Sequence, residues 1–152
     1  MIDAPSFAAG REPTIFRVWP DYVLEPQIDR SAPTVKADAA WRSYDATGRG
    51  VVWAVIDSGI DYTHAEFNDG TPGDYAAATA NTSTSPGWPQ GNVVGGYDFV
   101  GETWDGDTVV SLLPDADPID AEDGHGTHVA DIIGGDLGVA PGVDLLAVKV
   151  CS

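Results

Sequence analysis

Three short apolar runs along the chain predict β-strands. Residues 51–56 (VVWAVI) do not alternate with polar residues, so we expect both faces of this strand to be covered, as in an internal strand of a parallel sheet. Residues 92–101 (NVVGGYDFVG) predict a second strand. Residues 143–150 (VDLLAVKV), which follow the turn-forming stretch Ala-Pro-Gly, predict a third.

Two segments show the periodicity of amphipathic helices. Residues 125–133 precede a Gly-Gly pair and place these side chains at helical spacing: His128, Val129, Ile132 and Ile133. Residues 36–50 contain a short helix stopped by glycines, with one face formed by Ala39, Ala40, Trp41 and Tyr44. The order of strand, helix and strand predicts an α/β fold with a parallel sheet.

The remaining segments read as connections. Residues 1–14 predict a tail, residues 14–26 one short strand and a turn, and residues 29–35 a linker. Residues 68–91 are small, polar and turn-rich, which predicts a long surface insertion. The acidic residues 115–123 predict a loop that is either solvated or holds a hard cation through oxygen ligands.

Composition narrows the function classes. The 152 residues, 43% of them hydrophobic, suffice for one domain with a core. The formal net charge is −17, and after position 50 the chain has 17 acidic residues against Lys149 alone, which excludes a nucleic-acid partner. No apolar run has the length to cross a membrane. The first twenty residues lack the pattern of a signal peptide.

Cys151 is the chain's one cysteine, so we expect no internal disulfide. It is expected to be a small buried apolar side chain in a strand. The alternative is a thiol whose partner lies in sequence that this chain lacks.

The first candidate for chemistry is Asp57, directly after the strand at residues 51–56. Functional side chains of parallel α/β sheets collect at the carboxyl ends of the strands. A carboxylate at that position is partly desolvated and needs a hydrogen-bonding or cationic partner. From the strand alone, the favoured alternative is a structural one, in which Asp57 caps a turn through the amides of Gly59 and Ile60.

His125 offers such a partner. It begins the predicted helix, where the positive end of the helix dipole disfavours a protonated ring, and a neutral histidine can act as a general base. Gly124 and Gly126 on either side allow a close approach of substrate or backbone. We expect His128 to be a hydrogen-bonded core histidine. The alternative is a metal shared by His125, His128 and nearby acids such as Asp123.

The stretches "AVIDSGIDYTHAEF" and "DGHGTHVA" resemble the aspartate and histidine motifs of the subtilisin-like serine proteases, in which the triad runs in the order Asp, His, Ser. "KADAAWRSYDATGRGVVWAVID" is similar to the start of the mature catalytic domain, and "GVAPGVDLLAVKV" to the stretch after the histidine helix. The likeness runs from about residue 35 to 152, apart from 68–91. It implies a three-layer, parallel-sheet α/β fold, of which this chain supplies the amino-terminal part.

The resemblance also implies roles. Asp57 would orient and stabilise the ring of His125, and His125 would take the proton from an attacking serine hydroxyl. His64 matches a second histidine of the aspartate motif that is not catalytic. The implied activity is a secreted serine endopeptidase that hydrolyses peptide or protein substrates and requires no cofactor for its chemistry.

No serine of this chain stands in a Gly-Thr-Ser-Met-Ala-like nucleophile motif. We therefore expect the carboxyl-terminal remainder of the catalytic domain to supply the nucleophile, as continuous sequence or as a separate chain. This chain alone is then inactive. The resemblance assigns residues 1–33 to the end of a propeptide and a linker, with a processing point between Asp29 and Thr34, and residues 34–152 to the catalytic domain.

Two questions stay open in the sequence. Glu66 stands where relatives place a calcium-binding acid, but the adjoining turn "GGDLGVAPG" is short, so a structural calcium is a possibility only. The alternatives to a protease are a catalytically inactive pseudoprotease fragment that binds peptides, and a cation-binding interaction module.

Overall fold

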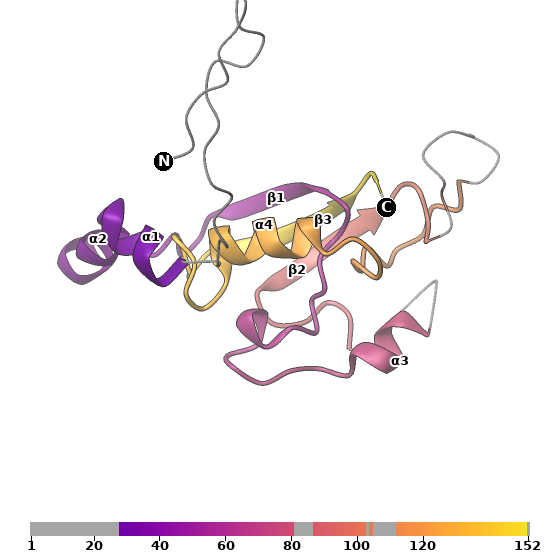
Figure 1. Ribbon diagram of the computed structural model, residues 1–152, viewed down its shortest axis with the longest axis horizontal. Coiled ribbons are helices and arrows are strands. Elements are labelled where there is room, and N and C mark those ends of the chain that lie inside the picture. Colours follow the sequence, from indigo (N-terminus) through magenta and orange to yellow (C-terminus); the bar gives the residue numbers. More distant parts are fainter. Residues whose placement is uncertain (1–27, 81–86, 103, 105–111, 152) are drawn as a thin grey trace, which may run out of the picture.

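A computed structural model describes residues 28–80, 87–102, 104 and 112–151. Three parallel strands, β1 (Val52–Asp57), β2 (Val93–Asp98) and β3 (Asp144–Lys149), form one sheet in the order β1-β3-β2 (Figure 1). The three predicted strands and the parallel sheet are confirmed. The tail and short strand expected within residues 1–26 lie outside the described residues.

The helices surround the sheet unevenly. They are α1 (Ile28–Thr34), α2 (Ala37–Tyr44), the short 3-10 helix η1 (Ala65–Phe67), α3 (Tyr75–Thr79) and α4 (His125–Gly134). Figure 1 shows α4 lying across one face of the sheet, with α1 and α2 beyond one end of it. Of the three expected layers, the described residues therefore supply the sheet and one helical layer.

The amino-terminal helices differ from expectation in two respects. The linker expected at residues 29–35 is wrong, because α1 covers most of it and buries Ala32 to 4% exposure. The helix expected within residues 36–50 is confirmed as α2, but Tyr44 of its expected apolar face is 82% exposed. The face that packs carries Ala37 and Trp41, whose indole nitrogen donates to the carbonyl of Val139 at 3.0 Å.

Within the described residues, the expectation that both faces of the first strand are covered is met on one face only. In β1 only Val55 is buried, whereas Val52 and Ile56 on the opposite face are 60% and 67% exposed. In the sheet that the described residues form, α4 covers one face and β1 lies at one edge. The internal strand is β3, whose Leu145 and Ala147 are fully buried.

The most deeply buried residues of α4 are small. The helix buries Gly126, Ala130 and Gly134, which recur every four residues. His128 lies two residues from both Gly126 and Ala130, which places it on the opposite side of the helix. It is exposed there, so the expectation of a core histidine is wrong. Val129 and Ile133 of the predicted face do pack against the core, whereas His128 and Ile132 are exposed. The apolar pattern missed the buried glycines, because it does not record positions where a close helix–sheet approach needs the absence of a side chain.

Gly126→Ala is expected to destabilise the protein by about 1–3 kcal/mol, because overpacking a close contact forces the backbone to move. A Cβ at Gly126 would overlap the carbonyl oxygen of Gly59. Chemical denaturation measures the effect, with Gly95→Ala as the control, since a Cβ there meets only the flexible end of Leu146 at 3.2 Å. A stabilised Gly126→Ala variant, as helix propensity alone predicts, would contradict this packing.

One hydrophobic core lies between α4 and the sheet and continues beneath the loops. Its buried members are Val55, Ile60, Tyr62, Phe67, Ala78, Val93, Ile119, Ala130, Val143, Leu145 and Ala147. The described parts of residues 68–91 take part in it. Ala78 of α3 is fully buried, and the ring of Trp88 lies 4.5 Å from that of Tyr62. This segment is therefore not only a surface insertion.

Two further features concern the surface and the end of the chain. Cys151 is exposed and lies beyond the end of β3, so the expected burial in a strand is wrong. Among the described residues, no helix is long and apolar enough to span a bilayer.

Candidate active site

Asp57 and His125 meet at the carboxyl edge of the sheet. Nδ1 of His125 lies 2.8 Å from Oδ1 of Asp57, although the two residues are 68 positions apart in sequence. The aspartate side chain is 18% exposed and the histidine side chain 63% exposed. A partly buried carboxylate thus holds the ring of an accessible histidine.

Asp57 is fixed by the strand that it ends. Its carbonyl accepts from the amide of Val150, and its Oδ1 accepts from the amide of Ser58 at 2.8 Å. Burial alone would raise the pKa of this carboxyl, but the hydrogen bonds from His125 and Ser58 outweigh it and hold the pKa below its usual value. The alternative of a turn cap through Ile60 is wrong, because the amide of Ile60 donates to the carbonyl of Pro118.

His125 is the first residue of α4. The preceding Gly124 has a φ of 79°, in the left-handed region that favours glycine, and this turn aims the first helical side chain at the end of β1. The hydrogen bond to Asp57 and the charge of Asp57 raise the pKa of His125 above its usual value. The expected dominance of the helix dipole, which would favour the neutral ring, is therefore wrong, since a carboxylate in direct contact has the larger effect.

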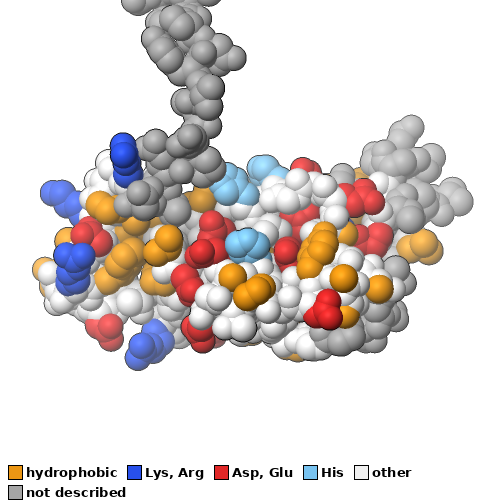
Figure 2. Space-filling model, turned by 60° about the horizontal axis from the view of Figure 1, so that its bottom comes forward, with side chains coloured by type: hydrophobic (Ala, Val, Ile, Leu, Met, Phe, Trp, Pro, Cys, Tyr) orange, Lys and Arg blue, Asp and Glu red, His pale blue; other side chains and the backbone are white. Residues whose placement is uncertain are grey.

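The surface around His125 is acidic. Figure 2 shows the Lys and Arg side chains at the end of the molecule where α1 and α2 lie, while Asp and Glu are spread along the rest of that face. Asp123 and Asp120 add to the rise in the pKa of His125. We therefore expect the neutral, base-competent form of this histidine to predominate only above its ordinary titration range near pH 6.5.

Ser58 is a site residue that sequence reasoning missed. Its side chain is 1% exposed, and its Oγ accepts from the amide of Gly126 in the first turn of α4 at 2.9 Å. This bond ties the loop after β1 to the helix that carries His125. The available signal was a hydroxyl residue directly after a strand-end carboxylate.

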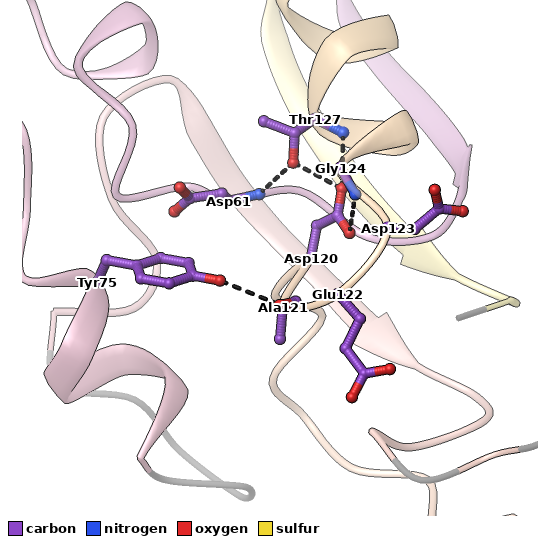
Figure 3. A pocket seen from close by; sticks show the side chains of 8 residues that line it. All are labelled: Asp61, Tyr75, Asp120, Ala121, Glu122, Asp123, Gly124 and Thr127. Carbon is purple, nitrogen blue, oxygen red and sulfur yellow. Dashed lines mark hydrogen bonds between the residues drawn. The ribbon is translucent and has the colours of Figure 1, made fainter.

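The acidic loop forms a second set of contacts beside the site. Asp117 and Asp120 are 1% and 4% exposed, so the interpretation of residues 115–123 as a solvated loop is wrong for these two. Asp117 accepts from the hydroxyl of Tyr62 at 2.9 Å. Asp120 accepts from α4 and borders an open cavity of about 250 Å³ that also reaches Tyr75 (Figure 3). Both carboxylates are thus held by hydrogen bonds from protein groups, and neither of these contacts involves a cation.

The described residues contain no group of three or more His, Cys, Asp or Glu side chains placed to bind a metal ion. His125, His128 and Asp123 therefore do not form such a group. Oε2 of Glu66 is buried without a hydrogen-bond partner, which suits a cation ligand, but calcium requires several oxygens. Side chains of the described residues do not assemble a calcium site around it, and the structural calcium stays a prediction.

The site is therefore an aspartate at a strand end hydrogen-bonded to a histidine at a helix start, on the parallel sheet of an α/β protein. A sequence model described as the Subtilase family matches residues 48–152. The chain therefore belongs to the subtilase family.

Named relatives support this assignment. The chain is similar to the minor extracellular protease Vpr of Bacillus subtilis, at 33% identity over 84% of this chain and 13% of that protein. It is similar to alkaline serine exoprotease A of Vibrio alginolyticus at 33% identity, over 87% and 22%. It is also similar to an intracellular serine protease of Paenibacillus polymyxa at 31% identity, over 82% and 30%. The chain thus spans less than a third of these relatives, and no solved structure matches it.

Proposed function

We propose that this chain is the amino-terminal portion of the catalytic domain of a serine endopeptidase, and that Asp57 and His125 are two members of its Asp-His-Ser triad. The observation that carries the proposal is the 2.8 Å hydrogen bond between the two side chains. Membership of the subtilase family supports it, because in subtilisin the triad aspartate also precedes the histidine in the chain.

The geometry suggests how each group acts. Because Asp57 occupies Nδ1 of His125, Nε2 is the ring nitrogen left to accept a proton. His125 takes the proton of the serine hydroxyl as that oxygen attacks the peptide carbonyl, and then returns it to the leaving amine. The carboxylate of Asp57 stabilises the imidazolium formed between these steps. General acid–base help of this kind contributes roughly 10²- to 10⁴-fold in rate.

The proposed partner is the carboxyl-terminal remainder of the catalytic domain, as continuous sequence or as a second chain. The face of the sheet opposite α4 supports this, because it exposes apolar side chains that a complete parallel α/β fold would cover: Val52 (60%), Ile56 (67%) and Tyr97 (40%). The relatives also support this, because they are several times longer than this chain and so contain further sequence that could supply the remainder of the domain.

Residues 1–33 are proposed to end a propeptide, with a cut between Asp29 and Thr34. That stretch lies in α1, where the amide of Val35 donates to the carbonyl of Ser31, so cleavage requires this helix to open. Amino-terminal sequencing of the mature protein tests the position of the cut.

Secretion is proposed by likeness to an extracellular relative, although another relative is named as intracellular. Mass spectrometry of the culture medium and the cell fraction of the source decides between the two compartments.

A serine-directed fluorophosphonate probe tests the proposed function on the complete gene product, with every chain present. Intact mass and peptide mapping first establish which chains are present. The proposal expects one labelled serine outside these 152 residues and hydrolysis of a protein substrate. Folded material that binds peptides without label or hydrolysis would instead establish the pseudoprotease alternative. Heat release on titration with zinc or calcium, without labelling, would establish the cation-binding alternative.

A further inference from the structure

At the start of α4, the second and third amides donate to side chains from outside the helix. Gly124, at the N-cap position, has no side chain and forms no side-chain cap. The second amide of the helix, that of Gly126, donates to Ser58. The third, that of Thr127, donates to Oδ2 of Asp120 at 3.1 Å. Unpaired amides at a helix start require such acceptors, which are ordinarily supplied by the N-cap residue itself.

Asp120 accepts three hydrogen bonds at this point. Its Oδ1 accepts from the amide of Gly124 at 2.9 Å, and its Oδ2 accepts from both the amide and the hydroxyl of Thr127, the latter at 2.7 Å (Figure 3). The residue is 4% exposed. Together these bonds span the peptide on both sides of His125 and fix the position from which its side chain leaves the backbone.

The same contacts reach the loop that follows Asp57. The hydroxyl of Thr127, which donates to Asp120, accepts in turn from the amide of Asp61 at 2.9 Å. The carboxylate of Asp61 accepts from the amide and hydroxyl of Thr63 and so holds the loop in its turn. Asp120 therefore links the backbone that carries His125 to the backbone that carries Asp57.

We propose that Asp120 is a positioning residue for the Asp57–His125 pair, acting through Thr127. The proposal rests on the proposed protease function, because positioning is meaningful only where His125 acts as a base. This role requires a carboxylate rather than an amide at position 120. Both oxygens of Asp120 accept, whereas an asparagine would turn one NH₂ group toward a donor. A negative charge at this end of the helix also interacts favourably with the helix dipole.

The test compares Asp120→Asn with Thr127→Val in the complete protease, using Thr127→Ser as the conservative variant that keeps the hydroxyl. Glu122→Gln is the matched control, since it removes the same charge from an exposed side chain that lines the same cavity. We expect kcat to fall about 10- to 100-fold in Asp120→Asn and Thr127→Val, with KM unchanged, because small misplacements of a catalytic group cost that much. Thr127→Ser should recover most of the loss, and Glu122→Gln should stay within twofold.

A second readout separates this proposal from the proposed function. The proton of His125 that lies between Nδ1 and Asp57 gives a low-field NMR signal, and positioning predicts that Asp120→Asn shifts or broadens it. That signal is measurable whether or not peptides are hydrolysed. An unchanged signal, with kcat within twofold of wild type in folded Asp120→Asn and Thr127→Val, would overturn the proposal. An inactive wild type with the expected change in the signal would overturn the protease function alone.

Discussion

Replacing His125 with alanine is expected to reduce kcat of the complete protease by about 10⁶-fold. This magnitude is taken from subtilisin, a protease with the same order of triad residues, in which loss of the histidine has been measured to cost that much. The physical reason is that the serine hydroxyl then has no base to accept its proton. A fluorogenic peptide assay under saturating substrate measures the change.

His128→Ala is the matched control for this prediction. His128 lies on the same helix, about one turn further on, and is exposed. The histidine that is hydrogen-bonded to Asp57 is His125. We expect its kcat to stay within twofold of wild type. Equal losses in the two variants, or a loss in His128→Ala alone, would show that the histidine assigned as the base is the wrong one.

Lys149→Met is expected to lower the free energy of unfolding by about 3–5 kcal/mol, because removing one partner of a buried ion pair leaves an uncompensated charge. The side chain of Lys149 is 2% exposed. Its Nζ lies 2.9 Å from Oε2 of Glu102 and 3.5 Å from Oδ2 of Asp98, and it donates to the carbonyl of Ile119 at 3.1 Å. Asp98 is fully buried, and burial already raises the pKa of Glu102.

Urea denaturation of the complete protein measures this loss. Arg42→Met is the control, because Arg42 pairs with Asp38 at 3.9 Å on the exposed surface of α2, where an ion pair contributes about 0.5 kcal/mol or less. The ion-pair account predicts a large loss in Lys149→Met and almost none in Arg42→Met. A Lys149→Met variant as stable as wild type would mean that the charges of Asp98 and Glu102 are compensated elsewhere.

The sequence predicted the strands and α4 because apolar runs bounded by glycine and proline reflect local backbone preferences. Its errors concern what lies against each element. The apolar run of β1 was interpreted as a strand covered on both faces, yet the described residues place a layer on one face only. In α4 the pattern predicted Val129 and Ile133, which pack against the core. It missed the buried residues Gly126, Ala130 and Gly134, which carry too little side chain to appear in a hydrophobic pattern.

At the site, the sequence predicted the two side chains that meet but not the contacts that hold them. Motif order and position pointed to Asp57 and His125, because a strand end and a helix start are visible in the pattern. Ser58, Asp120 and Thr127 form hydrogen bonds across long sequence separations, and no local periodicity records these. The sequence also did not predict that the pKa of His125 is raised, because this shift depends on the contact with Asp57 rather than on the helix.

The most direct test of the account is an NMR titration of His125 in wild type and in Asp57→Asn. A histidine bonded to a carboxylate holds its proton more tightly, so the account predicts a pKa above the ordinary 6.5 in wild type and a fall toward or below that value in the variant. The acid limb of the kcat/KM profile should lie at the same raised pH. A wild-type titration at or below the ordinary value, unmoved by Asp57→Asn, would contradict the pairing from which the proposed function follows.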